Sequence, residues 1–236
     1  MAFRITALLT GIRETDQGLM TYLKHYGRRI WLPMWSFLLQ GQDKNILVDT
    51  GLDDFITPES FTKETGLTPM FMEDALESVG LKPEDIHMII HTHLHDDHCG
   101  NNPLFPNAEV LVQRKELEFM DEPHPLDHRY EPSFLEGQLI RPLDGDQEIL
   151  PGLSVLLTPG HTPGGQTVVV DTDKGRMVIP GFCCNCENFP QAGPAVCPGV
   201  HTNALAAYDS VQKVKGLEGT ILPLHDLELA KLLVGG

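Results

Sequence analysis

The feature that most constrains the fold of this chain is a short segment, rich in histidine and aspartate, that directly follows an apolar strand. The segment reads IIHTHLHDDHCGNN, residues 89–102, and it begins within the strand-like run HMII. His93 and His95 are two residues apart, so on extended backbone both side chains point the same way and can bind one metal ion. Asp97 and His98 then face a neighbouring position, where a second cation can bind. A solvated polar loop is the alternative, but the density and order of the ligands favour a metal centre.

Two further histidines stand at the ends of predicted strands. His161 lies in TPGHTPGGQ, residues 158–166, where the flanking Pro and Gly residues predict a rigid turn. His225 ends the last predicted strand, in LPLHD. A histidine in such a place is usually a surface residue, but a catalytic zinc needs three protein ligands plus water. In a chain that already carries segment 89–102, both histidines are therefore expected to complete metal sites.

Short apolar, β-rich runs are interrupted by single helices along the chain. The expected strands cover residues 3–9, 36–41, 45–51, 86–93, 108–113, 153–160, 166–171, 175–181 and 220–226, and the expected helices 72–80, 114–120, 202–216 and 227–234. This order predicts an α/β sandwich with sheets inside and helices outside. A doubly wound nucleotide-binding fold is disfavoured, because no glycine fingerprint follows the first strand. With neither repeat nor linker, residues 1–236 are expected to form one domain.

The charge of the chain restricts its partners. A net charge of −16 repels phosphate backbones and anionic lipid headgroups, so neither nucleic acid nor a membrane is an expected partner. No stretch resembles a cleaved leader or a membrane span, which predicts a cytoplasmic protein. The five cysteines are an odd number, and we expect them to be reduced thiols.

Together these motifs resemble the metallo-β-lactamase superfamily, and within it the N-acyl-homoserine lactonase group. The matching stretches are ILVDTG (46–51), HTHLHDDHCGNN (91–102), AEVLVQRKELEF (108–119), LPGLSVLLTPGHTPGGQ (150–166) and ILPLHD (221–226). The resemblance implies a four-layer αββα sandwich with the site at one edge, between the sheets. It also implies two divalent metal ions, with zinc expected first and iron or manganese as alternatives.

The resemblance further assigns each ligand to one of the two metals. One set comprises His93, His95 and His161, and the other comprises Asp97, His98 and His225. Asp49 in VDTG would orient the ligands, since ligating histidines generally need a hydrogen-bond partner. Asp97 would in addition pass a proton to the leaving group, which makes it the expected catalytic residue.

The chain departs from this family at the aspartate that normally bridges the metals after a glycine. Here VIPGFCCN places Phe182 after Gly181, and phenylalanine cannot bind a metal. In one interpretation the bridge is missing, and the second metal binds more weakly. In another, a one-residue slip brings Cys183 to the site as a thiolate ligand. In the third, the cysteines are small buried hydrophobic residues in the wall of the site.

These observations predict a metal-dependent hydrolase that opens a lactone or a similar small ester through a metal-bound hydroxide. Tyr130, Phe134 and Phe182 are the expected walls of the substrate pocket. A thioesterase or glyoxalase II-like hydrolase is the first alternative, but it would need C-terminal cations, and only Lys231 is there. A non-hydrolytic iron oxygenase or redox protein that uses the cysteines is the second. The oligomeric state stays open, with a homodimer among the options.

Overall fold

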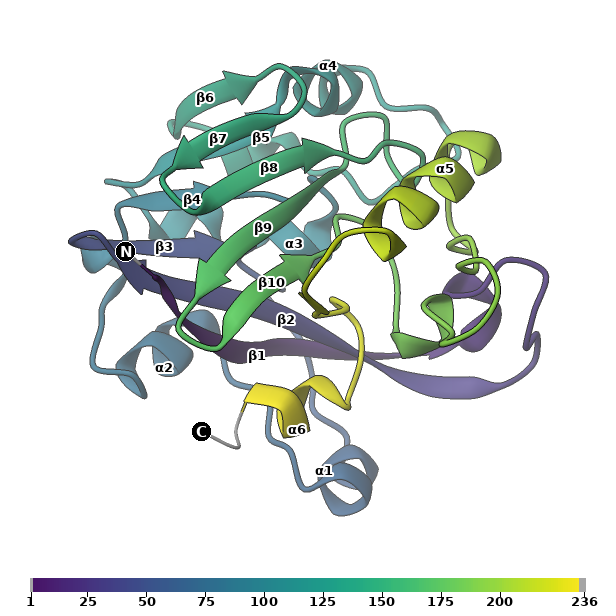
Figure 1. Cartoon of the computed structure of the whole chain (residues 1–236). Helices are drawn as coiled ribbons and strands as arrows, with labels where there is room; N and C mark the ends of the chain where they lie inside the picture. Colours follow the sequence, from purple (N-terminus) through teal and green to yellow (C-terminus); the bar gives the residue numbers. More distant parts are fainter. Residues whose placement is uncertain (1, 234–236) are drawn as a thin grey trace.

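The computed structural model describes residues 2–233 and contains two β-sheets packed face to face (Figure 1). One sheet is hydrogen-bonded in chain order: β1 (Arg4–Asp16), β2 (Arg29–Gly41), β3 (Lys44–Val48), β4 (Met88–Ile90), β5 (Glu109–Gln113) and β6 (Leu139–Leu143). The other contains β7 (Gln147–Leu150), β8 (Leu153–Leu157), β9 (Gln166–Thr172), β10 (Gly175–Ile179) and β11 (Thr220–Ile221). Its strand order is β11-β10-β9-β8-β7.

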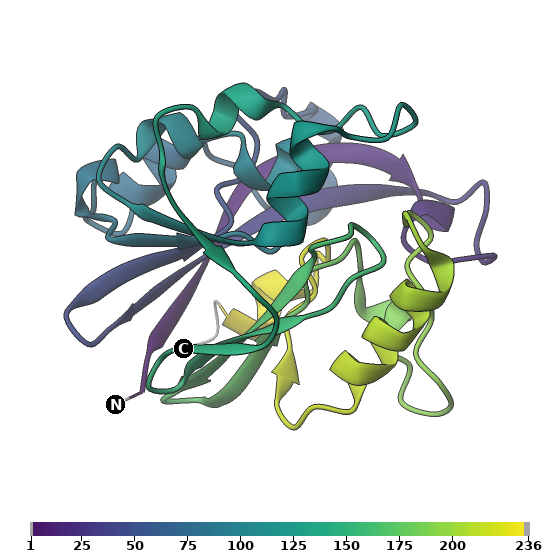
Figure 2. The same ribbon diagram turned by 90° about the horizontal axis from the view of Figure 1, so that it is seen from above.

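Helices cover the outer faces of both sheets (Figure 2). The α-helices are α1 (Glu59–Thr65), α2 (Met72–Glu77), α3 (Asp96–Cys99), α4 (Arg114–Asp121), α5 (Ala204–Lys215) and α6 (Leu229–Leu233). Short 3₁₀ turns are η1 (Gln17–Leu19), η2 (Pro83–Asp85), η3 (Asn102–Leu104), η4 (Pro132–Leu135) and η5 (Cys186–Asn188). Helices α2 and α4 lie on the six-stranded sheet, and α5 lies on the five-stranded sheet.

Three apolar clusters hold these layers together, because side chains alternate between the faces of each strand. Ile90 points inward and packs between the sheets with residues of β8, β9 and β10. Ile89, its neighbour, points outward and packs in the cluster that includes Ala75 and Leu76 of α2. On the other side, Val178 of β10 packs against α5. The result is a four-layer αββα sandwich, as the family resemblance implies.

Every predicted strand and helix corresponds to an observed element, but the sequence missed four others: β6, β7, α1 and the four-residue helix α3. Strand β6 reads LIRPL and is largely exposed, so it has neither apolar alternation nor a favourable strand composition. Strand β7 is similarly half-exposed. Helix α1 buries only Phe61. In each case too few residues are buried to leave a hydrophobic period in the sequence.

Parallel pairing places the loops of the site at one edge. Strands β3, β4 and β5 run in the same direction, with Ile46 opposite Met88 and Met88 opposite Glu109. Their carboxyl ends therefore lie together, and the loop after β3 meets the loop after β4. The histidine segment extends from this edge toward the second sheet.

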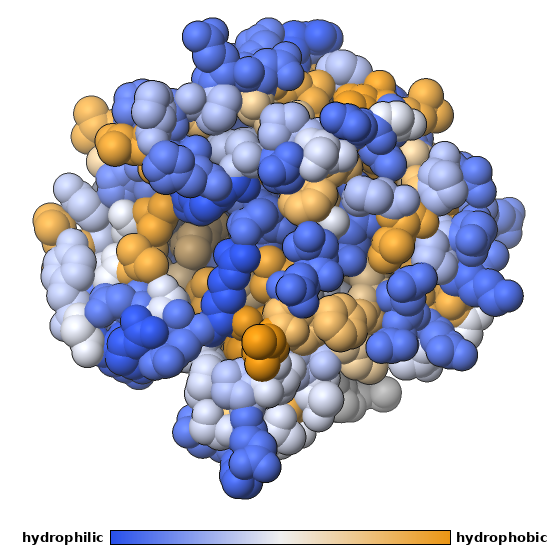
Figure 3. All heavy atoms as spheres, turned by 180° about the vertical axis from the view of Figure 1, so that it is seen from behind, coloured by the Kyte–Doolittle hydropathy of each residue, from blue (hydrophilic) through white to orange (hydrophobic). Residues whose placement is uncertain are grey.

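The surface is consistent with the high net charge. The face opposite to that of Figure 1 is mostly hydrophilic, and its apolar side chains form small separate groups (Figure 3). Within residues 2–233, no helix is long and apolar enough to cross a membrane.

Candidate metal centre

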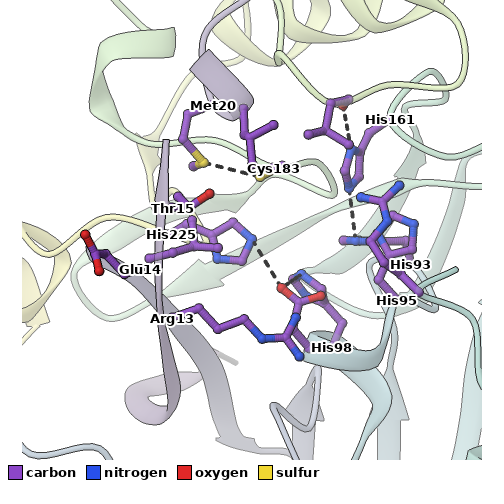
Figure 4. Close-up of a pocket in the computed structure, with 15 residues that line it drawn as sticks. Arg13, Glu14, Thr15, Met20, His93, His95, His98, His161, Cys183 and His225 are labelled. Atoms are coloured by element: carbon purple, nitrogen blue, oxygen red, sulfur yellow. Dashed lines mark hydrogen bonds and ion pairs between the residues drawn. The ribbon is translucent and has the colours of Figure 1, made fainter. Parts of the chain in front are cut away.

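Six side chains converge at this edge into two groups whose ligand atoms lie within 4.8 Å of one another. The first group is His93, His95 and His161, and the second is Asp97, His98 and His225. They come from the β4–α3 segment, the β8–β9 loop and the chain after β11. The five imidazoles point toward a common cavity of about 180 Å³ (Figure 4). The family resemblance implies the same two sets of candidate ligands.

Hydrogen bonds fix the rings of the first group so that their lone pairs face inward. His161 Nδ1 donates to the carbonyl of Val200 at 2.8 Å. His93 Nδ1 donates to Thr92 Oγ1 at 3.1 Å, and that hydroxyl in turn donates to Asp49 at 2.7 Å. Burial also holds the pKa of both histidines well below the usual value, so the rings are neutral. The Nε2 atoms of His93 and His161 then face each other at 3.2 Å, where a cation between them would relieve the repulsion of two lone pairs.

His95 is oriented by residues that the sequence did not reveal. Its Nε2 donates to Asp127 Oδ2 at 3.4 Å, which leaves Nδ1 as the ligand atom. Asp127 is in turn held by Arg129, whose Nε and Nη2 donate to the two carboxylate oxygens at 2.7 and 2.8 Å. Both residues lie in the loop DEPHPLDHRY, which has no local pattern that indicates this role.

The second group shows the same arrangement. His98 Nδ1 donates to Asp49 at 2.8 Å, and His225 Nδ1 donates to the carbonyl of Pro33 at 2.9 Å. His98 Nε2 is buried and has no hydrogen-bond partner among the described residues. Asp97 Oδ2 lies 3.6 Å from that nitrogen and 4.0 Å from His225 Nε2. A buried nitrogen that lacks a partner, next to a carboxylate and a second imidazole, fits a divalent cation.

Opposite charges balance one another in this second group. Burial opposes the charge of Asp97, but His98 and His225 hold the pKa of its carboxyl below the usual value. Burial likewise opposes the charge of His98, and Asp97 and Asp49 outweigh it and raise the pKa of His98 to about 8. Burial lowers the pKa of His225 to about 4. Asp97 is therefore an ionised acceptor at neutral pH.

Asp49 connects the two groups through hydrogen bonds to His98 and to Thr92, which in turn bonds His93. Its side chain is buried, with 1% exposed, and its φ of 60° is tolerated by aspartate better than by most residues. It accepts hydrogen bonds from the Thr92 amide at 2.8 Å and from His98. Burial opposes its charge, but His98 outweighs burial and the pKa of Asp49 is lowered to about 2.

A second buried carboxylate, Glu116 of α4, holds the loops of the first group, and no sequence motif indicates this role. It accepts from the Leu94 amide at 3.1 Å, the Tyr130 hydroxyl at 2.9 Å and the Gly164 amide at 2.9 Å. A Cβ at Gly164 would lie 2.3 Å from the Glu116 nitrogen, so only glycine allows the His161 loop to come this close. Glu116 thus ties the segments of His93, His95 and His161 together.

The aromatic residues predicted to line the pocket do not do so. Phe182 has 1% of its surface exposed and packs with Val178 and Cys184 in the cluster under α5, so the prediction is wrong. Phe134 packs on the outer side of the six-stranded sheet and lines a different cavity, which is a second error. Tyr130 lies behind the site, with its ring centroid 4.9 Å from that of His95. Its hydroxyl binds Glu116, and it supports a ligand instead of lining the cavity.

The segment where the family carries its bridging aspartate provides no carboxylate between the two groups. A Cβ at Gly181 would lie 1.8 Å from the carbonyl oxygen of Gln166, so that position requires glycine. The ring of Phe182 points into the α5 cluster. Within the described residues, the two groups share no carboxylate.

Cys183 reaches the wall of the metal cavity but belongs to neither group. Its Sγ contacts the sulfur of Met20 at 3.3 Å (Figure 4). Burial, reinforced by Asp97, raises the pKa of its thiol to about 12. In this arrangement the thiol is protonated and packs against Met20, and its role as a metal ligand stays a prediction.

The fold and the site agree with what the chain is similar to. Residues 29–181 match the model of the metallo-β-lactamase superfamily, and the chain belongs to that superfamily. Within it, an N-acyl homoserine lactonase of Bacillus cereus is 34% identical over 168 residues, which are 65% of this chain and 64% of the lactonase. The match therefore spans less than two thirds of the length of that curated relative.

Two solved structures extend the similarity over nearly the whole chain. One is a Bacillus thuringiensis AiiA variant with N-decanoyl-L-homoserine bound at its active site, with a TM-score of 0.77 and 28% identity over 98% of this chain and 97% of that one. The other is an N-acyl homoserine lactone hydrolase with its product, N-hexanoyl-L-homoserine, at its catalytic metal centre. It has a TM-score of 0.76 and 29% identity, with the same coverage.

Proposed function

We propose that this chain is a two-metal hydrolase that opens lactone rings, with N-acyl-homoserine lactones as its substrate class. The observation that carries the proposal is the convergence of six ligand atoms, with all five imidazoles hydrogen-bonded from behind so that one nitrogen of each faces the cavity. The similar lactonases support the choice of substrate. Zinc is the proposed metal, because imidazole with one carboxylate is a typical zinc ligand set.

The donor sets fit two such ions, His93, His95 and His161 holding one and Asp97, His98 and His225 the other. When bound, the ions would supply a water of lowered pKa and polarise the lactone carbonyl. Asp97 is ionised and faces the cavity, so it can accept a proton of the attacking water. It can then deliver this proton to the ring oxygen as the carbonyl carbon–oxygen bond of the ring breaks. Water adds across that bond, and the product is a hydroxy acid.

The proposal is tested by following acid release from N-hexanoyl-homoserine lactone and determining the molecular mass of the product by mass spectrometry. We expect one acid equivalent per ring opened, a product heavier by one water, loss of the activity with a chelator and its return with zinc. Two control measurements are made: the rate of cleavage of an S-acyl thioester, and oxygen consumption followed with an oxygen electrode. Preferential cleavage of the thioester, or oxygen consumption without acid release, would contradict the proposal.

A further inference from the structure

A second cavity, of about 480 Å³, lies directly beside the metal cavity; we call it the side cavity. Two residues, Arg129 and Val200, line both. The other residues of the side cavity are Phe119, His124, Leu126, Asp127, Gly199, His201 and Thr202. A molecule whose reacting group lies at the metal centre can therefore extend past Arg129 into the side cavity.

Arg129, which lies between the two cavities, has N–H groups that are not hydrogen-bonded to Asp127. Its Nε and Nη2 are engaged by Asp127, which fixes the plane of the guanidinium. Among the described residues no acceptor is hydrogen-bonded to Nη1, although the group carries five N–H donors in total. The side chain is 35% exposed, so Nη1 can reach a molecule in the cavities without first losing a protein partner.

The other arginine of the metal cavity is engaged differently. Both terminal nitrogens of Arg13 donate to Asp96, with distances of 3.4 and 2.6 Å. Arg13 thus donates to Asp96 from both terminal nitrogens, whereas Nη1 of Arg129 has no acceptor among the described residues. This difference singles out Arg129 as a donor to a bound molecule.

We propose that the side cavity takes the substituent next to the scissile carbonyl and that Arg129 Nη1 donates to an acceptor oxygen on it. That oxygen belongs to an amide carbonyl or to a carboxylate, both of which accept readily from a guanidinium. Apolar atoms beyond it would contact Phe119, Leu126 and Val200. The inference rests on the proposed function, and it makes Arg129 a residue that determines substrate preference.

The test compares Arg129→Gln with the wild-type enzyme on three lactones of equal ring size. One carries an N-acylamino group, one a free carboxylate, and one no substituent. A hydrogen bond from a charged donor corresponds to about a 10- to 100-fold effect, so kcat/KM should fall by that much more on the substituted lactones than on the unsubstituted one. Whichever substituted lactone loses more identifies the acceptor as amide or carboxylate.

Binding of the opened product, N-hexanoyl-homoserine, gives a readout that does not depend on turnover. Its affinity for the zinc-loaded protein, measured by calorimetry, should fall by a similar factor in Arg129→Gln, with the metal content unchanged. Arg129→Lys is the second variant if Arg129→Gln does not fold. It keeps a cation beside Asp127 but lacks the planar fork, so its kcat/KM should also fall more on the substituted lactones than on the unsubstituted one.

Two results separate this inference from the proposed function. Equal losses on all three lactones, with unchanged product affinity, would overturn the inference and leave Arg129 as a residue that positions Asp127 and His95. If the wild-type enzyme opens none of the lactones, the proposed function fails. The product affinity then decides the inference, and an unchanged value in Arg129→Gln overturns it.

Discussion

Replacing Asp97 with asparagine is expected to lower kcat/KM for lactone opening by about 10³-fold, with little change in the fold. The amide has the shape of the carboxylate, so the packing beside His98 and His225 is preserved. It provides neither a negative charge for the second cation nor a base that accepts a proton from water. Initial rates of acid release, with circular dichroism as a check of folding, measure the effect.

The adjacent residue provides the matched control. Asp96 has the same side chain and pairs with Arg13 at 2.6 Å, and both partners are partly exposed. Such pairs contribute at most about 1 kcal/mol to stability. Asp96 also belongs to neither ligand group, so Asp96→Asn should leave the rate close to that of the wild type. Equal losses in the two variants would show that Asp97 has no special part in the reaction.

Replacing Asp49 with asparagine is expected to weaken metal binding at the second group by about 10- to 100-fold. Asp49 accepts from Thr92 and from His98 Nδ1, and an amide offers only one oxygen. If its NH₂ group faces the His98 ring, the ring proton has to move to Nε2, which blocks the ligand atom. Competition with a chromogenic chelator measures the metal affinity of each of the two groups and therefore the loss at the second.

Glu116→Gln is the reciprocal control for that experiment. Glu116 supports the loops of His95 and His161, and none of its hydrogen bonds within the described residues goes to His98, so its amide variant should weaken the first metal and spare the second. Asp49 also reaches His93 through Thr92, so the deciding readout is the second metal: its weakening by Glu116→Gln would contradict this division of support.

The six candidate ligands could be predicted from the sequence because they stand close together or at strand ends. His93, His95, Asp97 and His98 occupy one short segment, and His161 and His225 follow apolar runs that a reader recognises as strands. Their supports could not be predicted in the same way. Glu116 lies 22 residues from Leu94 and 48 from Gly164 along the chain, so only the fold brings these groups together.

The predicted pocket walls failed for a related reason. Whether an aromatic ring in a loop faces a cavity depends on the path of the backbone, which residue type alone does not determine. Phe182 follows a glycine packed against Gln166, and its ring points toward α5. Arg129 lines the pocket instead, from a loop in which the sequence indicated only aromatic candidates.

The central claim, that two cations held by these six side chains open the lactone, is tested most directly by titrating zinc into metal-free protein while recording hydrolysis of N-hexanoyl-homoserine lactone. The account predicts no hydrolysis without metal and a rate that rises until two equivalents are bound per chain. Because no carboxylate is shared with the second group, that group should bind zinc more weakly. The part of the rate increase that depends on it should therefore need a higher free zinc concentration. Full activity in metal-free protein, or a rate that is complete at one equivalent, would contradict it.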